Sequence, residues 1–268
     1  RSIIQGEMTS PDTEFIHIMG TAGGPAERAA RPAPKAFPEI LPILRLSDIV
    51  IFPGMVVPLL VESAQSTRLI DDVVSGDRFL GLVLQRNPES DNPKPHELHP
   101  SGCVGRVMKM LKFPDNSVRV LIEGLRRFEI TEYVSEEPYL CARITARQDE
   151  QENSLEMTAL ARNAQLQFQD ILNLSPALSE QVKVTAIHTE HAGKLADLIT
   201  ANLNINLEER QALLEIVDVK ERLTRLLPLM SREQEVLSLG SKIQKEVATS
   251  MSKTQRDFFL REQIRAIQ

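Results

Sequence analysis

The chain has 268 residues, of which 42% are hydrophobic and 25% are charged, as is typical of a soluble globular protein long enough to bury its own core. No run of about 18 apolar residues exists and the first ten residues do not resemble a signal peptide, which excludes a membrane-spanning helix and membrane partners. A net charge of −6, the absence of Trp and an aromatic content of 4% argue against broad nucleic-acid binding.

Residues 1–37 are predicted to be a leader that is either disordered or partly a tag remnant. Gly23, Gly24 and Pro25 interrupt this segment, and it has little apolar periodicity. Residue 1 is Arg rather than Met, which suggests a trimmed or tagged chain.

Residues 38–150 are predicted to form a β-rich domain. A turn is expected at Pro53-Gly54, a helix between a Ser63 cap and Gly76, and a long surface loop over 86–102. About six strands with one helix fit a small, partly closed barrel or two packed sheets. The expected strands are 41–46, 55–62, 79–85, 103–113, 118–125, 126–134 and 139–147, with a hairpin turn at 114–117.

The two cysteines, Cys103 and Cys141, each lie in an apolar, strand-like run. This placement favours buried free thiols in a reducing compartment, and hence a cytoplasmic protein, over a disulfide scaffold.

The apolar period changes from two to 3.6 at about residue 150, so residues 151–217 are predicted to be a helical subdomain. Its expected helices are 155–174, one that begins at Ser175-Pro176, 191–204 and 207–216. The fold class is therefore α+β, with a β-rich subdomain, a helical bundle and a long C-terminal helix.

Residues 218–268 are predicted to form that long helix, which begins with a capping pattern at Asp218 and Glu221 and is kinked or broken at Pro228. Ser231 with Gln234 could cap a restart. A helix of some 35 residues is about 50 Å long, more than a small bundle can cover, so part of its apolar stripe must meet another chain or a further domain. No stop signal follows, and we expect the helix to lead into a further domain.

Catalytic and metal-binding patterns are nearly absent. The Gly193-Lys194 pair lacks the flanking residues of a phosphate loop, and His188 with His191 lacks further ligands, so an exposed helix junction is the better interpretation. Adjacent carboxylates such as Asp71-Asp72 point apart and are interpreted as solvated surface. We therefore expect no catalytic, cofactor-binding or metal-binding residue, and no enzyme activity in this chain alone.

Four blocks of the sequence, in order, are similar to the amino-terminal, substrate-binding region of the bacterial Lon ATP-dependent protease. The stretch 122–130 resembles the G-x-x-R segment of that family, 194–223 resembles its helical subdomain, and 252–268 resembles its linker helix, with Phe258-Phe259 as the aromatic pair. The first block is 41–61, where the similarity is carried by Leu44, Leu46, Asp48, Phe52, Pro53, Gly54, Met55 and Pro58.

The resemblance implies a PUA-like β-rich subdomain followed by helices. It also implies capture of unfolded or degron-bearing proteins and assembly of a homohexamer. The parent enzyme would use ATP and magnesium in an AAA+ ATPase module and a Ser-Lys dyad in a protease domain. Neither the phosphate loop nor the dyad is found in these 268 residues, so the long helix is expected to lead toward the ATPase.

The long helix supplies the candidate contact residues. Met251 and Phe258 are seven residues apart and so share a helix face. With Val247 and Phe259 we expect them to face neighbouring protomers or the substrate path, and a coiled-coil seam or an intramolecular core is the alternative. Met55, next to a predicted turn, is a second candidate contact, for which a place in the core is the alternative.

Two other functions remain open at the level of sequence. A PUA-like fold would allow a nucleic-acid-binding module, although the acidic charge argues against it. A pure oligomerisation scaffold, in which the long helix only sets the oligomeric state, is the other alternative.

Overall fold

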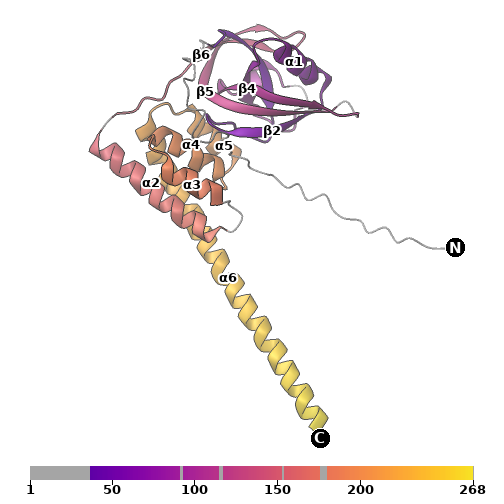
Figure 1. The fold of residues 1–268 in the computed structure, drawn as a ribbon, viewed down its shortest axis with the longest axis vertical. Helices are drawn as coiled ribbons and strands as arrows, with labels where there is room; N and C mark the ends of the chain where they lie inside the picture. The colour runs from indigo at the N-terminus through magenta and orange to yellow at the C-terminus, as the bar shows by residue number, and fades with distance from the viewer. Residues whose placement is uncertain (1–36, 91–92, 115–116, 153, 176–179, 268) are drawn as a thin grey trace, which may run out of the picture.

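The computed structural model describes residues 37–267 except 91–92, 115–116, 153 and 176–179, and gives only the backbone for 180 and 251–267. Two predictions concern residues outside the described part of the chain. These are the leader, except for residue 37, and the start of a helix at Ser175-Pro176, of which only Ser175 is described. Figure 1 shows three parts: a β-rich body, a group of helices beside it, and one helix that extends away from both.

Six strands form one mixed sheet that closes on itself. The order is β2-β5-β4-β3-β1-β6, and a further β5–β6 pairing completes a ring from which β2 projects as an edge strand. β1 and β3 are parallel and all other neighbours are antiparallel. The strands are β1 Ile40–Leu46, β2 Val56–Val61, β3 Phe79–Leu84, β4 Ser101–Lys112, β5 Val118–Ser135 and β6 Cys141–Ala146.

The prediction of separate strands at 118–125 and 126–134 is wrong, because β5 is one strand of 18 residues. Its first half pairs with β2 and its second half with β6, while β4 follows most of its length. The register against β4 shifts by one residue between the Val104–Arg126 and Gly105–Gly124 pairs. A bulge of this kind redirects a strand without ending it, so the interrupted apolar pattern resembled two strands.

Two helices of the β-rich part follow local signals. The helix α1, Ala64–Ser75, is capped by Ser63, whose side chain accepts a hydrogen bond from the Ser66 amide at 3.1 Å. Gly76 caps its other end, as predicted. The predicted surface loop contains one short 3-10 helix, η1, Pro95–Glu97.

The remaining helices follow the β-rich part in sequence. The helix α5 starts with a capping box, in which Asn206 and Glu209 each accept a hydrogen bond from the other's backbone amide, at 2.7 and 3.2 Å respectively. Asp218 accepts from the amides of Lys220 and Glu221 at the start of α6. The helices are α2 Leu155–Leu174, α3 Glu180–His188, α4 Ala192–Asn202, α5 Leu207–Glu215 and α6 Val219–Ile267.

The long helix is not broken at Pro228. α6 runs for 49 residues, about 74 Å, and Pro228 lies inside it. Pro228 is exposed, and so is Thr224, whose carbonyl loses its usual amide partner, so water can solvate that carbonyl. The Ser231 hydroxyl donates back to the Leu227 carbonyl at 3.1 Å and does not cap a new helix.

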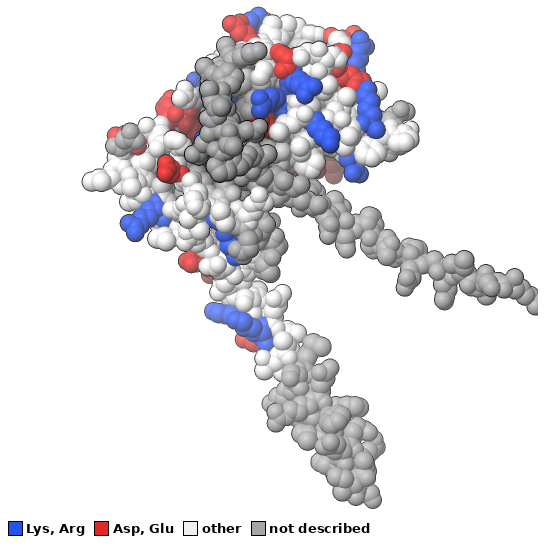
Figure 2. All heavy atoms as spheres, viewed as in Figure 1, with Lys and Arg blue, Asp and Glu red and all other residues white. Residues whose placement is uncertain are grey.

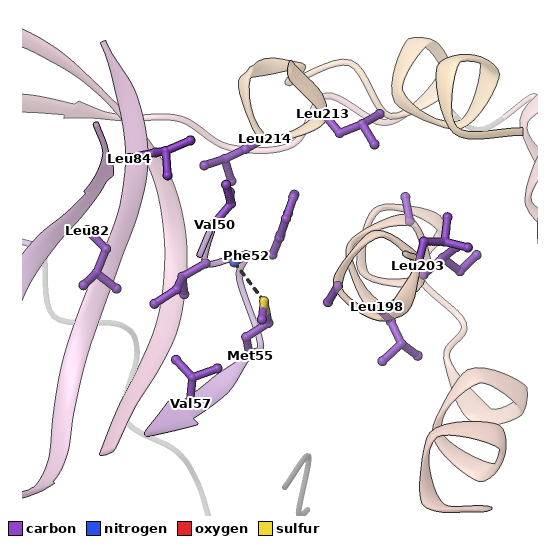
Figure 3. Packing of buried hydrophobic residues seen from close by; sticks show 14 of the residues in the cluster. Val50, Phe52, Met55, Val57, Leu82, Leu84, Leu198, Leu203, Leu213 and Leu214 are labelled. Carbon is purple, nitrogen blue, oxygen red and sulfur yellow. Dashed lines mark hydrogen bonds between the residues drawn. The ribbon is translucent and has the colours of Figure 1, made fainter. Parts of the chain in front are cut away.

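One apolar cluster joins the β-rich part to the helices. Figure 3 shows Val50, Phe52 and Met55 from the β-rich part facing Leu198 of α4 and Leu214 of α5. A smaller second cluster fills the barrel around Phe128 and Val104. The larger core continues across residue 150, so the predicted boundary there between a β-rich and a helical subdomain stays a proposal.

Gly124 allows the turn before β2 to rest on β5. The Gly54 amide donates to the Gly124 carbonyl and the Gly124 amide donates to the Met55 carbonyl, both at 2.8 Å. Gly54 has a φ of +86°, which explains glycine in this turn. A Cβ on Gly124 would lie 2.4 Å from the Phe52 carbonyl oxygen, so no larger residue fits without backbone movement.

We predict that Gly124→Ala lowers the free energy of unfolding by about 1–3 kcal/mol, because the turn must move away from β5. Gly240→Ala is the matched control, because a Cβ there meets nothing within 4 Å and alanine favours a helix. Urea unfolding followed by circular dichroism measures both variants. Equal stability of the two would contradict the close approach at Gly124.

Candidate functional site

One of the candidate contact residues, Val247, is exposed on the half of α6 that extends beyond the other helices. Val247 is 53% exposed, and it continues a row of exposed apolar side chains along the same helix. Met251, Phe258 and Phe259 lie further along α6, but their side chains are outside the described part, so their contacts stay a prediction. The other exposed members of the row are Val236, Leu239 and Ile243.

Met55 does not form an exposed contact in this structure. Its side chain is 2% exposed and its sulfur accepts a hydrogen bond from the Phe52 amide at 3.2 Å. Figure 3 shows it on the side of the turn that faces the helices. The helices cover the turn, so the candidate surface at Met55 is corrected to a core position.

A buried ionic cluster lies where the barrel meets the helices. Arg127 of β5 forms a two-point contact with Asp197 of α4, with nitrogen–oxygen distances of 2.5 and 2.9 Å. Arg222 of α6 donates to Asp149 in the β6–α2 connection at 2.7 and 3.1 Å and to Asp197 at 3.2 Å. Arg127 also reaches Asp149, at 3.3 Å. We call these four residues the junction cluster.

Backbone carbonyls complete the junction cluster. Arg127 Nε donates to the Leu214 carbonyl at 2.9 Å, and Arg222 Nε donates to the Ile216 carbonyl at 2.9 Å. The cluster is therefore bonded to the end of α5 as well as to β5, α4 and α6. Arg127 is 3% exposed and Arg222 is 0% exposed, so these bonds are shielded from water.

The charges of the junction cluster balance, with two guanidiniums against two carboxylates. Burial raises the pKa of Asp197, and the guanidiniums of Arg127 and Arg222 oppose that rise by favouring the ionised carboxylate. Burial alone would lower the pKa of Arg127, but Asp197 and Asp149 raise it above its ordinary value. The cluster can hold elements together, and it offers no free acid or base for catalysis.

The β6–α2 connection fixes the start of α6. Glu150 pairs with Asp218 in a short parallel bridge, in which the Glu150 amide donates to Val217 at 3.1 Å and the Val219 amide donates to Glu150 at 3.0 Å. A Cβ on Gly193 would lie 2.3 Å from an Asp149 carboxylate oxygen, so this glycine lets α4 approach the same connection. The first turn of α6 is thus held at its position beside the barrel.

Two features of the sequence relate to the junction cluster. Arg127 and Gly124 form the G-x-x-R pattern of the 122–130 block, and the structure shows that its glycine seats the turn while its arginine enters the cluster. Asp197 is the acidic residue in an otherwise largely apolar face of α4, which was a usable signal for a buried partner. Nothing in the sequence indicates which cation it meets, 70 residues away.

A cleft of about 700 Å³ lies between the barrel and α5. Side chains of both signs line it, among them Arg86, Arg210, Asp48 and Glu208. In the described part of the chain no three His, Cys, Asp or Glu side chains come close enough to hold a metal ion. His188 ends α3 and His191 precedes α4, both exposed, which agrees with the predicted helix junction.

The comparisons with known proteins decide the family. The sequence profile of the ATP-dependent protease La (LON) substrate-binding domain matches residues 40–232. The chain belongs to that family. It is 38% identical over 231 residues to the Lon protease of Dictyoglomus thermophilum and 40% identical over 231 residues to Lon protease 2 of Myxococcus xanthus. These matches cover 86% of this chain but only 29% and 28% of the two relatives.

Solved structures agree on the fold. The chain is similar to a Lon N-terminal domain protein from Xanthomonas campestris, with a TM-score of 0.52, 18% identity and coverage of 70% of this chain and 97% of that one. The N-terminal domain of Mycobacterium avium complex Lon protease gives a TM-score of 0.57 at 24% identity, covering 72% and 98%. Both the α+β class and the Lon family expected from the sequence are confirmed. No helix within the described residues is long and apolar enough to cross a membrane.

We predict that Arg127→Met lowers the free energy of unfolding by about 3–5 kcal/mol, because it leaves buried carboxylate charge without its partner. Arg147→Met is the control, since the Arg147–Glu129 pair is exposed and its loss should change stability little. Urea unfolding of both variants measures the difference. Equal losses would show that the junction cluster does not hold the subdomains together.

The two cysteines should differ in reactivity. Burial raises the pKa of the Cys103 thiol to about 12, so almost none of it is the nucleophilic thiolate near neutral pH. Cys141 is partly exposed. We predict that a disulfide reagent modifies only Cys141 in the native chain and both thiols after denaturation, as mass spectrometry would show. A Cys141→Ser chain that still reacts in its native state would contradict this.

Proposed function

We propose that this chain is the substrate-capture region of a Lon-type protease and that it also takes part in oligomer assembly. It would bind unfolded or degron-bearing proteins in the cytoplasm and pass them to the ATPase and protease parts of a homohexamer. Use of ATP and magnesium, and peptide-bond cleavage, would belong to those other parts. The family match supports the general role, and the proposal adds the class of substrate and the assembly.

The observation that carries this proposal is the exposed apolar row on α6. A domain that folds alone normally buries such a row against its own core. Leu226 and Met230 of α6 are fully buried against the bundle, whereas Val236, Ile243 and Val247 are more than half exposed. Figure 1 shows the same helix extending well past the other helices. Its free half is therefore suited to a second chain, either a protomer or an unfolded substrate.

The junction cluster supports a mechanical part of the proposal. Arg127 of β5 and Arg222 of α6 both pair with Asp197 and Asp149, so the cluster connects the barrel to the first turns of α6. A helix held in this way would keep a fixed direction relative to the barrel. We propose that a substrate bound by the domain is thereby presented at a defined position relative to the parts that follow α6.

Two alternatives make different predictions. A pure oligomerisation scaffold would self-associate through α6 without affinity for unfolded protein. A PUA-like nucleic-acid-binding module would bind RNA with a strong dependence on salt. Both can be distinguished from substrate capture in one binding experiment.

We predict that the chain binds a fluorescently labelled, reduced and carboxymethylated protein but not its native form, and that RNA does not compete. Fluorescence anisotropy measures this directly. Replacing Ile243, Val247, Met251 and Phe258 with Ser should lower that affinity about tenfold or more, because the apolar row is lost. Leu155→Ser, at an exposed position on α2, is the matched control.

Sedimentation of the same variants separates capture from assembly. Loss of self-association with unchanged affinity for the unfolded protein would support the scaffold alternative for α6. Binding that RNA abolishes would support the nucleic-acid alternative and overturn the proposal.

A further inference from the structure

The outer face of the sheet at β2, β5 and β4 is a second exposed apolar surface. In the register of these strands, Leu60 of β2 lies opposite Arg119 of β5, which in turn lies opposite Leu111 of β4. In the next exposed row, Leu121 of β5 lies between Pro58 and Lys109. Leu60 is 55% exposed and Leu111 is 50% exposed. We call this surface, extended by Met108 and Phe113, the barrel face.

The barrel face carries two cations, Arg119 and Lys109, that form no ion pair with a described carboxylate. Arg119 stacks over the Phe113 ring, 4.9 Å from its centre, and within the described residues neither it nor Lys109 forms an ion pair. The neighbouring cations differ. Arg106 pairs with Glu123 at 2.6 Å and Lys112 pairs with Asp71 at 2.7 Å. Figure 2 shows both blue and red side chains among white ones on the barrel.

The pattern of the face determines what it can bind. Its middle is apolar and, among the described residues, the charges on it that lack an ion pair are positive, so the complementary partner combines apolar side chains with carboxylates. Two cations are too few for the many phosphate contacts that nucleic-acid affinity requires. Pro58 also removes a backbone donor from the edge strand β2, which disfavours extension of the sheet by another strand. Contact is therefore expected through side chains across the face.

We propose that the barrel face binds segments of protein substrates in which acidic and apolar residues alternate. This inference rests on the proposed function, because it names a class of segment that the substrate-capture region would recognise. Apolar side chains of the segment would cover Leu60, Leu111 and Phe113, and its carboxylates would pair with Arg119 and Lys109. The face would thus select acidic segments among the many apolar ones that an unfolded protein exposes.

The test uses three fluorescein-labelled peptides of about 16 residues, long enough to cross the three strands. In the first, Asp alternates with Val and Phe. The second has Lys in place of Asp, and the third has Ser in place of Val and Phe. The 268-residue chain should bind the first peptide about tenfold or more tightly than either of the others. Equal binding of the Asp and Lys peptides would overturn the charge selection.

Variants locate the site. The combined change Leu60→Ser, Leu111→Ser and Arg119→Glu should remove most of the affinity for the Asp peptide, about tenfold or more. These side chains are exposed, so the fold should be kept, and circular dichroism with urea unfolding checks this. The matched control is Leu166→Ser with Ile187→Ser, which are exposed to a similar degree on α2 and α3. An equal loss in the control, or none in the face variant, would overturn the assignment.

The same variants keep this inference separate from the proposed function. If the face variant and the unaltered chain bind both the Asp peptide and the carboxymethylated protein equally well, the assignment of the barrel face as the peptide site is wrong, whereas the proposal of substrate capture stands. If the chain binds the Asp peptide through the face but does not bind the unfolded protein, substrate capture fails while the face is confirmed as a peptide site. An RNA oligonucleotide that displaces the Asp peptide would overturn the choice of a protein partner.

Discussion

Arg127 and Arg222 share two carboxylates, Asp149 and Asp197, and four separate parts of the chain meet at that contact. Burying an ion costs several kcal/mol, which is recovered only when donors and acceptors are matched in place. Here both guanidiniums also donate to backbone carbonyls at the end of α5 and just beyond it. The barrel, the β6–α2 connection, α4 and α6 must therefore keep one arrangement for these charges to remain paired.

That arrangement explains why the molecule has one continuous core and yet leaves a long helix uncovered. The cluster and the apolar contacts of Phe52 and Met55 hold the helices against the barrel. Met230 is the last fully buried side chain of α6 among the described residues, and Leu237, two turns further on, still packs against the core. Further along the helix, Leu239, Ile243 and Val247 are each more than half exposed, and we propose that they offer a surface to other polypeptides.

Two exposed surfaces with different chemistry follow from the same frame. The row on α6 is apolar, while the barrel face adds the cations Arg119 and Lys109. Because the junction cluster fixes the two parts, these surfaces would act at a constant separation on one bound chain. A substrate that reaches both would gain affinity through effective concentration without a new contact at either surface.

The sequence by itself determined most of the elements and the family. Caps such as Ser63, Asn206 and Asp218, the change of apolar period near residue 150 and the ordered family blocks are local signals, because they depend on neighbours within a few residues. The tertiary structure alone decided the burial of Met55, the single long β5 and the continuity of α6 through Pro228. It also decided the partners of Arg127. Each of these depends on contacts with a segment distant in the chain. Such long-range contacts produce no local pattern from which the sequence could predict them.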